Sequence, residues 1–291
     1  GYSVLPGKEG DKMILALTVI LFFLMVLVGG NRGLDSFFAL VRTVLALIVN
    51  IYLIAWGLPP VLVTLVISIF FVVTVLYVQN GRNAKMHAAA IAVAIVMLLV
   101  LAVAGPILWR AGISGYNEIE QYEEISMYLS ANLSVPMPAV SLAAVILGLL
   151  GAVMDTAVAI TTAVNEVYMN NRGLTEKELF RSGMRVGRDI LGTTVNTLFF
   201  AGLGESIMLA VLFMKSEDSF AVILNSKSLF QEVSGLLTGA IGCLFIIPLS
   251  SFLAAAFLTF SEEKADKNEK LLQKCYKCCK KVLKSVKNVL E

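Results

Sequence analysis

One long apolar stretch decides the class of fold. Residues 138–168 read PAVSLAAVILGLLGAVMDTAVAITTAVNEVY, which exceeds the ~20 residues that a helix needs to cross the hydrocarbon core of a bilayer. The stretch carries one carboxylate, Asp155, near its middle. A charged side chain at that depth costs on the order of 3 kcal/mol, so such residues are rare and are usually paired and functional. We therefore take Asp155 as the starting point for function.

The composition of the whole chain agrees with this class. Of its 291 residues, 58% are hydrophobic and 15% are charged, whereas a soluble domain is nearer one half and one quarter. The predicted spans cover approximately residues 13–30, 36–57, 59–79, 86–109, 138–168, 188–214 and 229–260. We expect an all-α, polytopic transmembrane bundle of about seven spans. The first stretch is interpreted as a retained helix, because further spans follow and no small-residue cleavage site is present.

Lysine and arginine predict the orientation, since they accumulate in cytoplasmic segments. Their distribution favours an N-terminus outside and a C-terminus inside. The predicted parts are an extracytoplasmic segment (1–12), a transmembrane domain (13–260) and a cytoplasmic tail (261–291). An N-terminus outside suggests a late-inserted first helix, or an extracytoplasmic domain with a leading span in another chain or removed from this one. The outer loop 111–137 is acidic, and it is either a solvated loop or a vestibule that collects cations.

A cytoplasmic linker helix is expected over residues 170–187. Gly173 can end the preceding helix in the left-handed conformation, and Thr175 with Glu178 forms a capping-box pattern that starts the next helix. Arginines follow at the membrane edge, where phosphate anchoring is favoured over substrate binding. Among them, Arg188 and Asp189 are predicted to form an inner-edge pair.

The start of the sixth predicted span is rich in small and polar residues. At 1.5 Å per residue, Asp155 lies roughly as deep as Asn196 and Thr197 of this antiparallel neighbour. Asn196, Thr193 and Thr197 are therefore predicted to be hydrogen-bond partners of Asp155. The functional hypothesis is a titrating carboxylate in a proton or cation path. The alternative is a structural hydrogen-bond cluster around a protonated aspartate. Glu205, between glycines, is a further coupling candidate or a locally wetted side chain at a helix break.

Three stretches carry a family resemblance: residues 151–155 (GAVMD), 182–190 (SGMRVGRDI) and 192–198 (GTTVNTL). Together they resemble the YibE/F family of bacterial multispanning membrane proteins. That resemblance implies an N-terminal span and an extracytoplasmic β-rich domain ahead of the helical part. Two spans are also similar to the RND permeases and to SecD/SecF, in which an aspartate works in proton coupling. The matching positions would be Asp155, Glu166 and Gly173. Glu205 and the tail depart from the YibE/F pattern.

The tail combines nine lysines with apolar residues at helical spacing. This pattern predicts a basic amphipathic helix on the anionic inner leaflet. Cys275, Cys278 and Cys279 lie one helical turn apart and are weak candidates for a soft metal. With no fourth ligand nearby, apolar packing or lipidation is favoured. No cofactor is expected.

These observations favour a proton-coupled transporter, or a transporter subunit, in the bacterial cell (inner) membrane. The alternative is a non-transporting assembly or sensory partner of an extracytoplasmic domain. An enzyme is not expected, because HExxH and paired membrane aspartates are absent and the only histidine, His87, is far from Asp155 in sequence. Expected partners are the lipid bilayer, an extracytoplasmic domain or partner subunit, and further copies of the chain. Nucleic acid is not among them.

Overall fold

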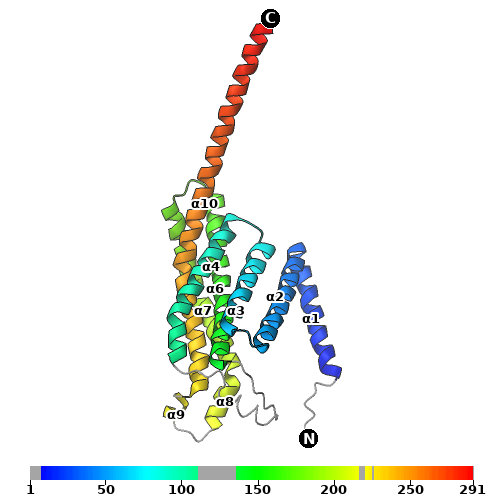
Figure 1. The fold of residues 1–291 in the computed structure, drawn as a ribbon, viewed down its shortest axis with the longest axis vertical. Coiled ribbons are helices and arrows are strands. Elements are labelled where there is room, and N and C mark those ends of the chain that lie inside the picture. The colour runs from blue at the N-terminus through cyan, green and yellow to red at the C-terminus, as the bar shows by residue number, and fades with distance from the viewer. Residues whose placement is uncertain (1–7, 111–135, 216–219, 225, 291) are drawn as a thin grey trace.

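The chain folds into a helical bundle from which one long helix projects (Figure 1). This computed structural model describes residues 8–110, 136–215, 220–224 and 226–290, with only the backbone for 261–290. Every element in these ranges is a helix. They are α1 (Lys8–Gly29), α2 (Asn31–Ala55), α3 (Pro60–Val72), the π-helix η1 (Val73–Gln79), α4 (Ala84–Arg110), α6 (Met137–Asn170), α7 (Glu176–Glu205), α8 (Ile207–Lys215), α9 (Phe220–Leu224) and α10 (Lys227–Leu290).

Six described helices are long and apolar enough to cross a membrane, one fewer than the spans predicted from sequence. The difference is the predicted span 188–214. The structure divides it at Ser206 between α7 and α8, and the first half of α7 carries several charges. Nevertheless, α7 runs along the bundle beside the others, and the start of α1 lies at the end opposite the tail (Figure 1). The chain is thus a multi-pass membrane protein in which α7 lies beside helices that are long and apolar enough to cross the membrane.

The turns between helices follow from a few residues. Between α2 and α3, Gly57 adopts a φ of 87°, and Pro59 precedes Pro60, the first residue of α3. Proline is tolerated at a helix start because no intrahelical hydrogen bond is lost there. Before α7, the predicted capping box is present: the Thr175 hydroxyl accepts from the Glu178 N–H, and the Glu178 carboxylate accepts from the Thr175 N–H at 2.8 Å.

Two predictions about the linker 170–187 are wrong. Gly173 is not in the left-handed conformation; α6 instead ends at Asn171, which has a φ of −147° and whose side chain accepts from the Gly173 N–H at 3.3 Å. Nor is the linker helix a separate element. No glycine turn or proline follows the cap at Thr175, so α7 continues without a break from Glu176 to Glu205. The break expected at the outer end of this helix is found at Ser206.

The core forms around α10, which packs against α4, α6 and α7. Fully buried side chains include Ile146 and Val153 of α6, Val96 of α4 and Ile246 of α10. Helix α3 packs against α6, and α1 packs on α2 at the edge of the bundle (Figure 1). The apolar side chains of α1 remain exposed, as is usual for a surface that lipid covers.

The predicted tail is helical, but it does not form a helix of its own. Helix α10 runs unbroken through it and leaves the bundle lengthwise (Figure 1), because no glycine or proline occurs after Pro248. The position of this part of α10 on the inner leaflet stays a prediction. Cys275, Cys278 and Cys279 lie outside the described side chains, and the acidic residues of the outer loop lie outside the described residues.

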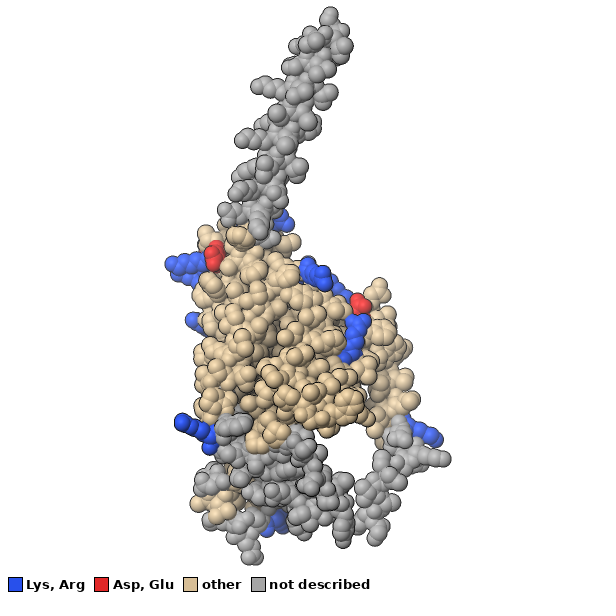
Figure 2. Space-filling view, in the orientation of Figure 1, with Lys and Arg blue, Asp and Glu red and all other residues tan. Residues whose placement is uncertain are grey.

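Charged side chains gather towards the two ends of the bundle. Figure 2 shows a broad belt of uncharged residues between them, with many of the visible basic side chains near the end from which the tail leaves. An uncharged belt of this kind suits the hydrocarbon layer. The concentration of basic residues supports the predicted orientation, with the tail on the inner side.

Candidate functional site

Close helix packing unites α6, α7 and α10. At Gly183 of α7, an added Cβ would lie 2.7 Å from the Ser251 hydroxyl oxygen of α10. At Gly187, a Cβ would collide with Ile247 of α10. The same crowding is found at Gly202 against Leu236 and at Gly242 against Leu149. Small residues thus let these helices approach closely on the sides of α6 and α7 that meet α10.

Asp155 lies on the opposite side of α6. Val153 packs beside Gly242 of α10, and Asp155 is two residues further, about 200° around the helix. Its side chain is exposed, and within the described ranges no hydrogen bond or ion pair involves it. The adjacent Thr156 is buried; its hydroxyl donates to the Ala152 carbonyl at 2.9 Å and lies 3.7 Å from the Cys243 sulfur.

The depth of Asp155 can be read from these contacts. Cys243 of α10 contacts Thr156 and is therefore at about the same depth as Asp155. On α10, Cys243 lies between Leu236, which contacts Gly202 of α7, and Ile247, which contacts Gly187 of α7. The segment 187–202 of α7 is therefore level with Asp155. It contains Gly192 and all three residues that the sequence predicted as hydrogen-bond partners.

Those partners do not hydrogen-bond to Asp155 in this structure. The Thr193 hydroxyl donates to the Ile190 carbonyl, and the Thr197 hydroxyl donates to the Thr193 carbonyl, both at 2.8 Å. Asn196 is exposed and nine residues from Gly187, so it faces away from α10. Asp155 and Asn196 both face away from α10, so they lie on the outer surface of the α6–α7 pair. Their side chains do not point at each other across the interface between the two helices.

The other predicted residues are spread along the same helices. Glu166 is exposed three turns inward of Asp155, and its carbonyl accepts from the Asn170 side chain at 2.8 Å. Arg188 and Asp189 are both exposed, and no ion pair joins them in the part of the chain that is described. Glu205 is the last residue of α7. The structure therefore does not gather these side chains around Asp155.

A groove of about 340 Å³ runs between the outer ends of α6, α7 and α10. Its polar lining comprises Ser141, Glu205, Gln231 and Glu232, and Glu232 accepts a hydrogen bond from the Ser206 hydroxyl at 3.2 Å. Gly148 also lines it. Asp155 follows Gly148 by seven residues, nearly two turns, and thus lies on the same side of α6 about 10 Å further inward. The groove thus lies on the side of α6 that carries Asp155 further inward.

A family model described as YibE/F-like protein matches residues 17–260. The chain belongs to the YibE/F-like family. The matched region includes α6, α7 and the part of α10 inside the bundle, and so holds both Asp155 and the groove. No curated protein and no solved structure matches the chain.

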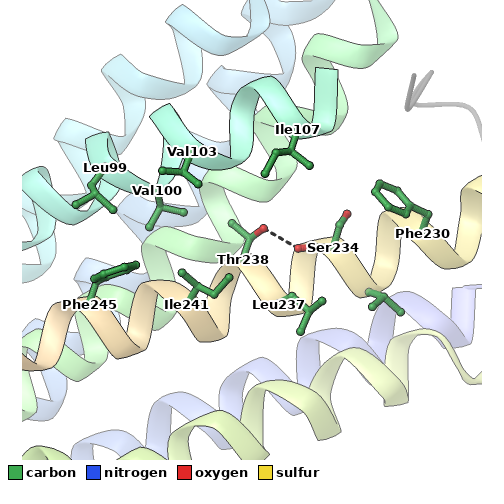
Figure 3. A pocket seen from close by; sticks show the side chains of 11 residues that line it. Leu99, Val100, Val103, Ile107, Phe230, Ser234, Leu237, Thr238, Ile241 and Phe245 are labelled. Carbon is green, nitrogen blue, oxygen red and sulfur yellow. Dashed lines mark hydrogen bonds between the residues drawn. The ribbon is translucent and has the colours of Figure 1, made fainter. Parts of the chain in front are cut away.

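A second groove of the YibE/F-like chain differs in chemistry. It has a volume of about 380 Å³ between α4 and α10, and Figure 3 shows apolar side chains of both helices around it. The hydroxyl of Thr238 in this lining donates to the Ser234 carbonyl of its own helix at 2.6 Å. Because the lining presents no charged group, this groove suits hydrocarbon better than an ion.

Several polar contacts do not follow from the sequence pattern. His87 is hydrogen-bonded through Nδ1 to the Tyr77 hydroxyl at 3.0 Å. Asn50 is buried and accepts from the Thr64 hydroxyl at 3.3 Å. Gln231 and Glu232 are not among the predicted site residues. They lie within a few positions of Gly235 and Gly239, much as Asp155 lies close to glycines on α6. Within the described residues, no group of side chains is suited to hold a metal ion.

One ionisable group outside the membrane-spanning segments is clearly perturbed. The pKa of Glu178 is lowered, first because the Thr175 backbone N–H donates to its carboxylate and second because the Thr175 hydroxyl does so. Arg181 lowers the pKa of Glu178 further through its charge. Hydrogen bonds and positive charge favour the ionised form of a carboxylate, so the cap that starts α7 is strongest when Glu178 is charged.

Proposed function

We propose that this YibE/F-like chain is a proton-coupled transporter, or a subunit of one, in the bacterial cell membrane. The observation that carries the proposal is the position of Asp155. It is a carboxylate level with the packed interior of the bundle, with no hydrogen bond or ion pair among the described residues, on the side of α6 that lines the outer groove. Carboxylates at this depth are costly to keep charged, and they commonly serve proton relays.

The groove supports an approach from the outer side. Glu205 and Glu232 bring negative charge to its lining, which favours protons or other cations over anions. From Gly148 inward, the same side of α6 continues to Asp155. Cargo or protons that entered the groove would therefore meet the carboxylate after two further turns of helix.

Protonation of Asp155 would change what its side chain requires. The charged form needs hydrogen-bond donors or water, whereas the neutral form is tolerated beside apolar groups. Asn196, Thr193 and Thr197 are level with it on α7 and would supply donors if the polar sides of the two helices turned towards each other. Gain and loss of a proton would thus favour different arrangements of α6 against α7, and no enzyme chemistry or cofactor is required.

The test is proton flux in liposomes that contain the purified chain and a trapped pH-sensitive dye, under an imposed pH gradient. Native protein should move protons faster than empty liposomes, and Asp155→Asn should reduce this protein-dependent flux at least tenfold. Asp35→Asn is the matched control, because Asp35 is an exposed aspartate on α2 and should leave the flux unchanged.

Unchanged elution and thermal unfolding of Asp155→Asn would show that the variant remains folded. Full flux in that variant would contradict the proposal. Absence of flux from the native chain, with any in vivo activity surviving loss of Asp155, would instead favour a non-transporting assembly or sensory partner.

A further inference from the structure

We propose that a second copy of this chain packs against the outer surface of α6 and α7, with Asp155 of each copy opposite Asn196 of the other. This inference concerns assembly and does not depend on transport. It starts from two polar side chains that make no hydrogen bond among the described residues, and from the shape of the surface that carries them.

The first step is the cost of exposure. Asp155 and Asn196 are both exposed on the single chain, and neither side chain has a hydrogen-bond partner among the described residues. Both are level with the packed interior, where lipid tails offer no donor or acceptor. Polar side chains at such depth normally face other helices or water. We therefore expect another protein surface with hydrogen-bonding groups to pack here.

The second step is shape. Gly151 of α6 lies one turn before Asp155, and Gly192 of α7 lies one turn before Asn196. Both glycines are exposed, and an added Cβ at either would meet nothing within 4 Å. At other glycines in these helices, the space for a Cβ is occupied by a neighbouring side chain, as it is at Gly187 by Ile247. Small residues spaced along one side of a membrane helix allow another helix to approach closely. Among the described residues, no other helix reaches this surface near the two glycines.

The third step identifies the occupant. A carboxylate accepts hydrogen bonds and an amide donates them, while the Thr193 and Thr197 hydroxyls already donate to their own helix. Asp155 is level with the α7 segment that holds Asn196. A two-fold axis along the membrane normal keeps every residue at its depth. With that axis between α6 and α7, α6 of one copy lies against α7 of the other. The surface is thus complementary to itself, as a symmetric dimer requires.

Cross-linking between two differently tagged copies tests this arrangement. In a background with Cys275, Cys278 and Cys279 replaced by serine, one copy carries Gly151→Cys and the other Thr197→Cys. A membrane-permeant bismaleimide should give a product that carries both tags. The control pair carries Leu98→Cys in both copies, because Leu98 is a 64% exposed residue of α4, and should give at least fivefold less product.

A second variant keeps the proposal open to refutation if cysteine chemistry is inefficient. Gly151→Leu enters open space in the single chain, so folding should persist, while the added side chain would separate the two copies. Single-molecule photobleaching in vesicles should show at least threefold fewer two-copy spots for this variant than for native protein, with Leu98→Phe unchanged. Equal cross-linking at Leu98, a product with an unrelated protein only, or an unchanged two-copy fraction in Gly151→Leu would each overturn the proposal.

Discussion

The two sides of α6 and α7 carry similar small residues in opposite surroundings. Towards α10, Gly183 and Gly187 leave no room even for a methyl group. Away from α10, Gly151 and Gly192 border open space, and the polar residues Asp155 and Asn196 lie beside them. The comparison teaches that glycine in a membrane helix marks a potential contact, and that only the fold tells which contacts are made within one chain.

The largest expected effect comes from adding one methyl group on each side of α7. Gly187→Ala should destabilise the protein by about 1–3 kcal/mol, because the new Cβ would collide with Ile247 and force the packed helices apart. Gly192→Ala should be neutral or stabilise by up to about 1 kcal/mol, since its Cβ meets nothing and alanine favours helix. Thermal or denaturant unfolding in detergent measures both. Equal effects would break the comparison.

A smaller effect on stability is expected at the N-terminal cap of α7, which follows the loop from α6. Thr175→Ala removes the side-chain cap and should cost about 1 kcal/mol of stability. Because the pKa of Glu178 is lowered in the folded chain, its own contribution is complete above its ordinary pKa of 4.5. That contribution is lost as the pH falls through the lower folded value.

Unfolding followed between pH 6 and about pH 3 would check this pH dependence. The native chain should lose stability over the acid part of this range relative to Glu178→Gln, in which residue 178 no longer titrates. Parallel pH profiles of the two proteins would show that the Glu178 carboxylate does not stabilise the cap.

The smallest effect on stability is expected from removing a hydroxyl group on the side that faces α10 or on the exposed side. Thr156→Val removes a buried hydroxyl that lies between the Ala152 carbonyl and the Cys243 sulfur, and should cost about 0.6 kcal/mol, the usual size for such bonds in membrane helices. Thr193→Val acts on the exposed side, where the hydroxyl bonds only within its own helix, and should change stability less. A reversed order would show that the exposed side is the more constrained one.

Much of the fold follows from local sequence. Most of the long apolar stretches and the capping box at Thr175 depend on neighbours within a few residues, and they appear where the sequence predicts them. The depth of Asp155 relative to α7 also follows from helix rise alone. Features that depend on distant contacts were harder: the groove joins residues of three helices, and Tyr77 meets His87 across a turn.

Some errors have a plain physical origin. Gly173 permits a left-handed turn but does not require one, and the Asn171 side chain closes the loop instead. The tail is predicted as an amphipathic helix of its own, but helix continuity is broken by residues such as glycine and proline, which the tail lacks. The direction in which Asn196 faces depends on which side of α7 meets α10, and no periodic pattern in a helix rich in glycine and threonine sets that side.

The central claim is that Asp155 gains and loses a proton within the membrane. Dicyclohexylcarbodiimide enters bilayers and forms a stable acylurea with protonated carboxyl groups, and mass spectrometry of the digested protein then locates the modified residue. Modification at Asp155 is expected to be efficient at low pH, to fall as the pH is raised through the titration of this carboxyl, and to be absent in Asp155→Asn. An Asp155 that stays unmodified at every pH, or is modified equally at all of them, would contradict the account.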